Sequence, residues 1–574
     1  MTIATEDSEN YNACIEAKRA SLLEKIPIEW RLDSLKEKLP TDSENVNFFL
    51  DSVLPESENK ITVQSASDLA AKISNGELSA YDVTYAYCHR AALIQQLCNC
   101  CAEIFFDIAL KRAQQLDEYY KETGKVAGPL HGIPISLKDQ INLKGIDTGI
   151  GYVAPYLEDK TYQSIICDRK IENIKDESNK GQPESEIAKI LYNAGAVFYV
   201  KTTVPMAMLG GETSSNIFGH TKNPLNRSLV CGGSSGGEGS LLGARGSVCG
   251  LGTDIGGSIR IPSMAQGLFG LRASSNRFTY LNISNSYPDQ TVVCSVVGPM
   301  CRFVEDVELI SKTLIDAEAW KVDAKVPPIP WREPSIKSTD KLNFGVLKWD
   351  SVVMPHPPIL RGIELVKNSL KSKGHEIIEF EKPPIPHGPL CSLLTSIYAA
   401  DALEEIKNYC EMSGEPLNEL LVRSFKSQKD KLKVDEFWDQ AKMKYKYQQA
   451  YDQFFENTAN LTSNGEPIVA QIIPAWNSTA WKHKDNMKTA GLYTRFLNIL
   501  DYTVLTIPVT QVDKSIDLKD ENYKPTNEFD ESNFNYYDPE LYDSMPVVLQ
   551  IVCRRYEEEK AIKLAKIIQD SLKN

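Results

Sequence analysis

Apolar positions at helical spacing mark the N-terminal part of the chain. Residues 14–26 place hydrophobic side chains three and four positions apart, and Pro27 interrupts this pattern. Ser65 and Ser79 are each followed three residues later by an aspartate, a pattern that caps the start of a helix. We therefore predict an N-terminal helical extension over residues 1–60, followed by two capped helices.

Farther along, the apolar spacing changes to the period of two that is typical of strands. In residues 132–139, GIPISLKD, apolar and polar side chains alternate, which places Lys138 near the end of a strand, on the face opposite the apolar side chains. Strand ends of α/β sheets are where ligands usually bind. Further strands are expected over residues 196–200, 342–347, 375–380 and 547–552, with helices over residues 185–195, 358–373 and up to about residue 572.

Strands that alternate with helices predict an α/β fold, with layers around a mixed or parallel sheet. Two polar stretches, residues 169–185 and 513–540, have little apolar periodicity, and we interpret them as surface insertions rather than domain linkers. The sequence therefore predicts one large domain over residues 61–574, interrupted by these two insertions.

Composition and charge exclude several classes of function. The chain has 63 Lys and Arg against 77 Asp and Glu, a net charge of −14, which argues against a nucleic-acid binder because phosphate neutralisation needs a basic face. The opening MTIATEDSEN lacks the basic and apolar regions of a signal peptide, and no apolar run is long enough for a transmembrane segment. With thirteen scattered cysteines, we expect a reduced, cytoplasmic protein. Cys98, Cys100 and Cys101 lack a second ligand group, so we interpret them as packing residues and expect no metal.

The segment with the strongest chemical signal is the glycine-rich stretch over residues 231–260. A phosphate loop is one interpretation, but neither GxxxxGK[ST] nor GxGxxG is present. A nucleophile elbow, GxSxG, is a second, and it matches with either Ser234 or Ser235 at its centre. That elbow should follow an apolar strand and needs a late histidine. His387 and His483 are the candidates, and we interpret both as packing or surface residues.

The third interpretation is a resemblance to the amidase signature family. GGSSGGEGSLL (232–242), followed by GLGTDIGGSIRIP (250–262), resembles the signature block of that family. GPLHGIPISLKDQI (128–141) resembles the strand that carries its lysine. The stretches that resemble the link between the two are KTTVPMAMLG (201–210) and NIFGHTKNPLNRS (216–228). Two further segments are similar to fungal acetamidase-type members: EKIPIEWRL (24–32) and AYCHRAAL (86–93).

This resemblance implies a Ser–Ser–Lys triad on a twisted mixed sheet between helical layers. Ser258 would be the acylated nucleophile, Ser234 the bridging serine and Lys138 the base. The spacing agrees, since Ser258 follows Ser234 by 24 residues. In physical terms, a serine hydroxyl needs a base to accept its proton, and a lysine can serve only when it is neutral. A lysine at a strand end among hydroxyls and glycine backbone can be desolvated, which lowers its pKa from the ordinary value of about 10.4.

The residues around the two serines have predicted supporting roles. The consecutive amides of residues 255–258 lie on a turn before a predicted helix and suit an oxyanion hole, because their donors are fixed where charge develops. We expect Asp254 and Arg260 to hold this loop by hydrogen bonds and Ser235 to stabilise its own loop. Met208 matches a family position whose carbonyl faces the substrate amide, with core filling as the alternative. The predicted substrate-binding residues are Met208, Ser234, Ile255, Gly256, Gly257 and Ser258.

We predict an amidohydrolase that cleaves small aliphatic or aryl-alkyl primary amides, such as acetamide, with water and no cofactor. The oligomeric state is open, and a homodimer is one option. The first alternative is a subunit of a glutamine-dependent tRNA amidotransferase, against which the fungal-type opening argues. The second is a catalytically silent binding protein. A lipid-amide hydrolase on a membrane is a lesser alternative, and without a spanning helix it would need an amphipathic surface.

Overall fold

The computed structural model describes residues 5–157, 183–287, 290–337, 339–424, 430–485 and 492–573. The predicted insertion over residues 169–185 lies outside the described residues, apart from its last three. The other predicted elements fall within them.

One sheet of eleven strands runs through the described part of the molecule. The strands predicted from alternating apolar positions all belong to it. In spatial order the sheet consists of β1 (Cys101–Ile104), β3 (Val197–Thr202), β2 (Pro134–Lys138), β6 (Cys249–Asp254), β8 (Val296–Cys301), β7 (Phe269–Arg272), β12 (Thr503–Gln511), β13 (Pro546–Cys553), β11 (Ala470–Pro474), β9 (Asn343–Leu347) and β10 (Glu376–Phe380).

The sheet is mixed, and its pairing sets the position of the site. Strand β2 pairs in parallel with both β3 and β6, so the carboxyl ends of these three strands meet at one edge. Strand β6 pairs antiparallel with β8, and antiparallel pairs continue through β7, β12 and β13 to β11. Parallel pairing returns between β11, β9 and β10. The prediction of a single large α/β domain with a mixed sheet is therefore confirmed.

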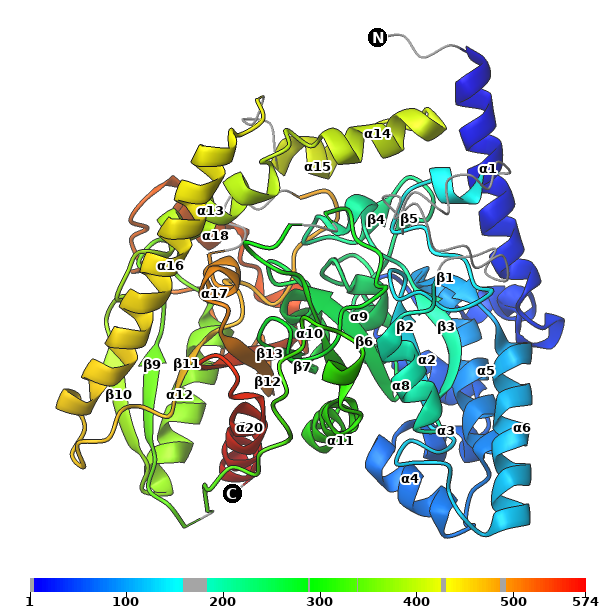
Figure 1. The fold of residues 1–574 in the computed structure, drawn as a ribbon, viewed down its shortest axis with the longest axis horizontal. Coiled ribbons are helices and arrows are strands. Elements are labelled where there is room, and N and C mark those ends of the chain that lie inside the picture. The colour runs from blue at the N-terminus through cyan, green and yellow to red at the C-terminus, as the bar shows by residue number, and fades with distance from the viewer. Residues whose placement is uncertain are drawn as a thin grey trace.

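Helices surround this sheet on all the sides that Figure 1 shows, with the N-terminal helices at one end and α16 at the other. Those from the N-terminal part are α1 (Thr5–Glu24), α2 (Val46–Val53), α3 (Glu56–Thr62), α4 (Ala66–Ser74), α5 (Ala80–Cys98), α6 (Phe106–Thr123), α8 (Glu186–Asn193), α9 (Gly236–Gly243) and α10 (Arg260–Gln266). Those that follow are α11 (Val304–Asp316), α12 (Pro357–Ser372), α13 (His387–Tyr398), α14 (Glu404–Ser413), α15 (Glu419–Ser424), α16 (Val434–Asn457), α17 (Arg495–Leu500), α18 (Glu528–Tyr536), α19 (Pro539–Tyr542) and α20 (Glu558–Leu572).

Local sequence signals explain where several helices begin. Ser65 accepts the backbone N–H of Asp68 at the start of α4, and Ser79 accepts that of Asp82 at the start of α5. These are the two capping patterns found in the sequence, and each satisfies an amide that the first turn leaves without a partner. The N-terminal segment does not stand apart from the sheet, because Trp30 belongs to the same buried hydrophobic cluster as the strands.

The polar stretch over residues 513–540 is folded onto the domain by polar contacts. Asn527 caps helix α18, whose Asp530 and Asn533 are buried. Asp530 accepts the backbone N–H of Met354 at 2.9 Å, and Asn533 donates to the carbonyl of the same residue at 2.7 Å. Because these contacts are polar, the apolar pattern of the sequence gave no sign of this helix.

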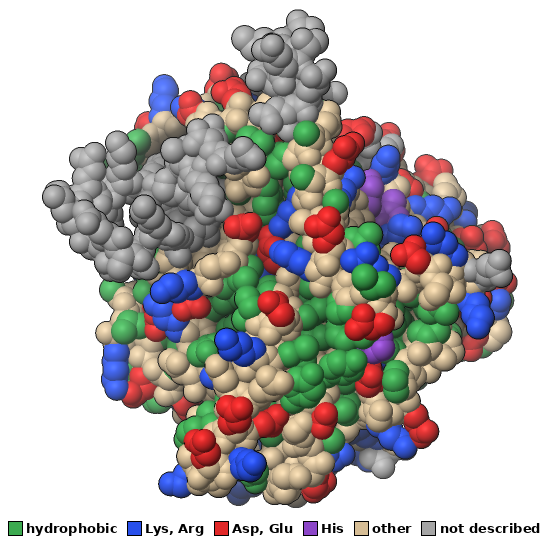
Figure 2. All heavy atoms as spheres, turned by 90° about the vertical axis from the view of Figure 1, so that its right-hand side faces the viewer, with side chains coloured by type: hydrophobic (Ala, Val, Ile, Leu, Met, Phe, Trp, Pro, Cys, Tyr) green, Lys and Arg blue, Asp and Glu red, His purple; other side chains and the backbone are tan. Residues whose placement is uncertain are grey.

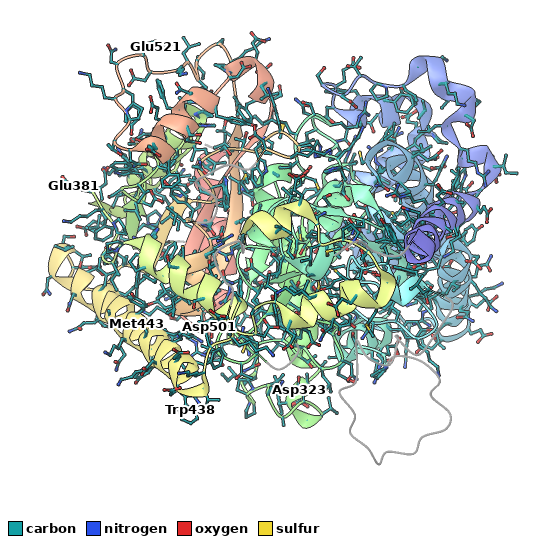
Figure 3. All side chains as sticks on the ribbon, turned by 90° about the horizontal axis from the view of Figure 1, so that it is seen from above. Asp323, Glu381, Trp438, Met443, Asp501 and Glu521 are labelled. Atoms are coloured by element: carbon teal, nitrogen blue, oxygen red, sulfur yellow. The ribbon has the colours of Figure 1, made fainter. Side chains whose placement is uncertain are left out.

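The outer surface carries both charges and some apolar side chains. On the face with the N-terminal helices, acidic and basic side chains are interspersed around an area of hydrophobic ones (Figure 2). At the other end of the molecule, α16 presents Trp438 and Met443 at its outer edge (Figure 3), and Trp438 is 67% exposed. Within the described ranges, no helix combines the length and the hydrophobicity that crossing a bilayer requires.

Candidate active site

Lys138 lies at the carboxyl end of β2, in the interior of the sheet. Its side chain is fully buried, because strands β3 and β6 flank β2 on either side. The Nζ atom donates to Ser234 Oγ at 2.8 Å and to Thr253 Oγ1 at 2.7 Å. Among the described residues, no carboxylate forms an ion pair with it. The partners of this amine are therefore neutral hydroxyls.

These surroundings change the protonation of the amine. Burial lowers the pKa of Lys138 to about 7, against the attraction of Asp254, Glu238 and Asp139, which raises it. Removal from water disfavours the charged form of an amine. Hydroxyl groups offset this desolvation cost less than a carboxylate in direct contact would. A pKa near 7 means that the neutral and charged forms of this lysine are both populated at neutral pH.

Ser234 and Ser235 precede α9 on a loop that is tied to the 253–258 segment. The Gly233–Ser234 peptide bond is cis. Ser235 donates its backbone N–H to the carbonyl of Ser258 at 3.1 Å. Its Oγ accepts the N–H of Thr253 at 3.2 Å and donates to the carbonyl of the same residue at 3.3 Å. The two predicted catalytic serines therefore belong to adjoining backbone segments that Ser235 connects.

Asp254 organises the turn after β6. Its carboxylate forms an ion pair with Arg260, at 3.0 Å from Nε, and accepts the side-chain amide of Asn498 at 2.8 Å. It also accepts the backbone N–H groups of Gly257 at 2.8 Å and Ile259 at 3.2 Å. Although burial alone would raise the pKa of Asp254, Arg260 and Asn498 hold it well below its ordinary value. A permanent anion therefore fixes the shape of this turn.

The four amides of residues 255–258 are not equivalent. That of Gly257 already donates to Asp254, whereas those of Ile255, Gly256 and Ser258 have no acceptor among the described residues. Gly257 has a φ of +122°, which L-residues rarely adopt. The carbonyls of the turn are also held, since that of Ile255 accepts the Tyr398 hydroxyl and that of Gly256 accepts Thr494 Oγ1 at 2.8 Å.

Ser258 borders a cleft of about 120 Å³ that is open to solvent. The turn of residues 255–258 lines the cleft next to Ser258. Met208, Tyr398 and the stacked pair Trp476 and Trp481, whose ring centroids are 5.6 Å apart, also line it. Ser234 and Ser258 both line a small pocket that adjoins Met208. Within the described residues, the Oγ of Ser258 makes no hydrogen bond. The structure thus joins Lys138 to Ser234 and leaves the hydroxyl of Ser258 at the cleft.

Three residues beside Lys138 were missed by the sequence analysis. Thr253 donates its hydroxyl to Gln140 Oε1 at 2.6 Å while it accepts the lysine. Glu238, on α9, is fully buried, and burial raises its pKa to about 8. It accepts hydroxyls from two strand residues at 2.5 and 2.8 Å. Thr253 and Glu238 lie inside the quoted signature block, so their position was a signal, but the letters do not tell what their side chains contact.

Comparisons with known proteins identify the family of this chain. The chain matches the family model described as Amidase over residues 82–169 and 174–562. It is 40% identical to an acetamidase of Emericella nidulans, with 97% of each chain covered, and 38% identical to an acetamidase of Aspergillus oryzae, with 96% of this chain and 97% of the relative covered. Among solved structures, a fatty acid amide hydrolase superposes with a TM-score of 0.86 and 32% identity, covering 98% of this chain and 96% of the other. The chain therefore belongs to the amidase family and is an amide-cleaving hydrolase.

Proposed function

We propose that this enzyme hydrolyses carboxamides to a carboxylic acid and ammonia through an acyl-enzyme on Ser258. The observation that carries the proposal is the buried Lys138 amine, whose hydrogen bonds within the described residues go to hydroxyl groups alone and whose pKa is lowered to about 7. A lysine in that state is a general base poised at neutral pH. The proposed substrates are small aliphatic or aryl-alkyl primary amides such as acetamide.

The proton path starts at the amine. Thr253 Oγ1 donates to Gln140 and therefore presents a lone pair to one N–H group of Lys138. In the neutral state, the lone pair of Nζ is then free to accept the hydroxyl proton of Ser234 at 2.8 Å. Ser234 in turn accepts the proton of Ser258 as the latter attacks the carbonyl carbon of the amide.

Attack on the carbonyl places a negative charge on its oxygen. The uncommitted amides of Ile255, Gly256 and Ser258 are the donors for this oxyanion, and Gly257 supports them by anchoring the turn to Asp254. The carbon–nitrogen bond breaks as the nitrogen takes up the proton held by Lys138 and Ser234, and ammonia leaves. Water then gives a proton to the same relay and attacks the acyl ester, which releases the acid and restores Ser258.

The substrate class is supported by similarity to two proteins named acetamidase, each covered over almost its whole length. A second candidate is an amide with a longer acyl chain. The cleft beside Ser258 is larger than acetamide requires and carries Trp476 and Trp481 on its wall. The similarity to a fatty acid amide hydrolase also favours this candidate.

The test measures ammonia release by the purified protein from a series of primary amides of increasing acyl length. We expect hydrolysis without glutamine or a partner subunit, loss of activity in Ser258→Ala, and full activity in the control Ser74→Ala, whose serine is exposed at the end of α4. A fluorophosphonate should label Ser258 and no other serine of the cleft. Activity that depends on glutamine would contradict the proposal in favour of the amidotransferase alternative, and absence of both labelling and hydrolysis would favour a silent binding protein.

A further inference from the structure

Three metal-ligating side chains meet at the edge of the cleft, outside the catalytic residues. Glu212 precedes the small strand β4 (Ser214–Ser215), His220 ends its partner β5 (Gly219–His220), and His483 lies in the loop after Trp481. Figure 1 shows β4 and β5 as a separate pair beside the main sheet. Residues far apart in the sequence are thus brought together, and within the described part of the chain this is the one such cluster of three.

The geometry of the cluster is convergent. His220 Nδ1 is 2.9 Å and His483 Nδ1 is 3.0 Å from the same atom, Glu212 Oε1. One ligand atom from each residue lies within 4.8 Å of the other two. The imidazole rings are 5.5 Å apart at an angle of 71°, so they approach the carboxylate from different directions rather than stacking.

The carboxylate is held in place. Its side chain is only 3% exposed, and its other oxygen, Oε2, accepts the backbone N–H of Lys484 at 3.1 Å. The imidazoles themselves are 33% and 21% exposed, so an ion can reach them from solvent.

We propose that Glu212, His220 and His483 form a binding site for a divalent ion of the zinc class. Two imidazole nitrogens and one carboxylate oxygen suit Zn²⁺, Co²⁺ or Ni²⁺ better than Mg²⁺ or Ca²⁺, which prefer oxygen ligands alone. At metal–ligand distances of about 2.0–2.1 Å, ligand atoms in a tetrahedral site lie roughly 3.3 Å apart. The two distances from Glu212 Oε1 to the imidazole nitrogens, 2.9 and 3.0 Å, have to lengthen by only a few tenths of an ångström to admit the ion, and a fourth position stays free for water.

The site also has a defined relation to the cleft. Glu212 and Trp481 line the same cleft as Ser258, and Gly211 joins Glu212 to that wall. A bound ion would connect the segment that carries β4 and β5 to the loop of His483, and so fix one side of the cleft. This proposal is independent of the proposed catalytic roles, because within the described residues no hydrogen bond joins the side chains of the three ligands to Lys138, Ser234 or Ser258.

The first test is isothermal titration calorimetry of the full chain with Zn²⁺, and with Mg²⁺ as a comparison. We expect one equivalent of Zn²⁺ to bind, His220→Ala to weaken its affinity by at least about 100-fold, and Mg²⁺ to give no signal. The matched control is His89→Ala, because His89 Nδ1 lies 2.8 Å from Glu58 Oε2 in a pair without a third ligand. This control should bind Zn²⁺ as the unaltered protein does.

The second test uses Co²⁺, whose visible spectrum reports the ligands. We expect the bands of a four-coordinate site without charge transfer from thiolate, lost in His220→Ala and in Glu212→Gln. Zn²⁺ should also raise the melting temperature of the unaltered protein and of His89→Ala, but not of His220→Ala. Absence of binding, binding unaffected by His220→Ala, or a cysteine-ligated spectrum would overturn the proposal.

Discussion

Lys138 and Lys201 are two fully buried lysines on neighbouring strands, and their surroundings are opposite in character. Strands β2 and β3 are parallel, and the residue before Lys138 is paired with Lys201. Lys138 contacts the hydroxyls of Ser234 and Thr253. Lys201 lies 3.5 Å from a carboxylate oxygen of Asp139 and donates to the carbonyl of Asp147 at 2.7 Å.

The comparison shows that burial alone does not make a lysine a base. Burial lowers the pKa of both amines, but Asp139 in direct contact opposes the effect at Lys201. Asp139 follows Lys138 in the sequence, yet side chains alternate along a strand, so its carboxylate faces Lys201 and accepts the N–H of Ile150 at 2.6 Å instead. The end of β2 thereby places the proposed base on one face and the counter-ion of a structural cation on the other.

The largest expected effect is that of Lys138→Met on catalysis. Without the base, Ser258 keeps its proton, and kcat/KM for the best amide of the series should fall about 10⁴-fold, the upper end of what a general base contributes. The measurement is ammonia release, with Lys121→Met, which alters an exposed lysine on α6, as the control that keeps full activity. A Lys138→Met protein that retains a tenth of the activity would refute the assigned role.

The next largest effect separates the two lysines by stability. Lys201→Met should lower the free energy of unfolding by about 3–5 kcal/mol, because Asp139 is left as a buried charge without its cation. Lys138→Met should have the opposite effect on the free energy of unfolding. The pKa of Lys138 is about 7 in the folded protein against 10.5 ordinarily, so the folded state binds fewer protons between these pH values, and below pH 7 burial of the charged amine opposes folding.

Urea titrations at pH 7 check this difference. Lys138→Met should be at least as stable as the unaltered protein, whereas Lys201→Met should be clearly less stable while its folded fraction keeps its activity. The dependence of stability on pH gives a second readout. The contribution of Lys138 to the free energy of unfolding should rise as the pH increases from 7 to 10.5, and this rise should be absent in Lys138→Met. Equal destabilisation by both substitutions would contradict the comparison.

How far the sequence could anticipate these two lysines depends on the element. Alternating apolar positions located β2, and therefore placed Lys138 at a strand end, whereas the continuous apolar run AVFYV located β3. Strand β6 was not predicted, because its sequence CGLGTD has no alternation. Its glycines are required by packing: a side chain at Gly250 would lie 1.9 Å from Glu238 Oε2.

In the candidate site, too, some features could be predicted from the sequence and others could not. Family motifs indicated Lys138, Ser234 and Ser258, and the structure brings the first two into contact, while the catalytic roles remain proposals. The motifs could not show that Asp254 takes the amide of Gly257, because the direction of an N–H group depends on the fold of the turn. The contact of Glu212 with His483 was equally hidden, because 271 residues separate the two in the chain.

The third prediction concerns pH. Because Lys138 must be neutral to accept a proton and its pKa is about 7, kcat/KM should fall about tenfold for each pH unit below 7, and so by about 100-fold at pH 5. Rates measured from pH 5 to 9, with circular dichroism at each pH to verify folding, test this directly. A rate that stays constant down to pH 5 would exclude Lys138 as the base.

The smallest expected effects come from removing one hydroxyl group beside Lys138 and one beside Lys201. Thr253→Val removes the acceptor that orients Lys138, which should lower kcat about tenfold. An ammonium donates a stronger hydrogen bond than a neutral amine does, so loss of the Thr253 acceptor disfavours the charged form of Lys138 and lowers its pKa. The acid limb of the pH profile, where the rate falls as Lys138 takes up a proton, should therefore move to lower pH.

The matched change is Thr148→Val, because Thr148 Oγ1 lies 2.5 Å from Nζ of Lys201. There the lost bond belongs to a structural cation, so stability should fall by about 1–3 kcal/mol while the acid limb stays in place. Both variants keep the shape of the side chain, and the two readouts therefore separate positioning of a base from support of a buried ion pair. If Thr148→Val moved the acid limb as far as Thr253→Val, the two lysines would belong to one coupled network, and the distinction drawn between them would fail.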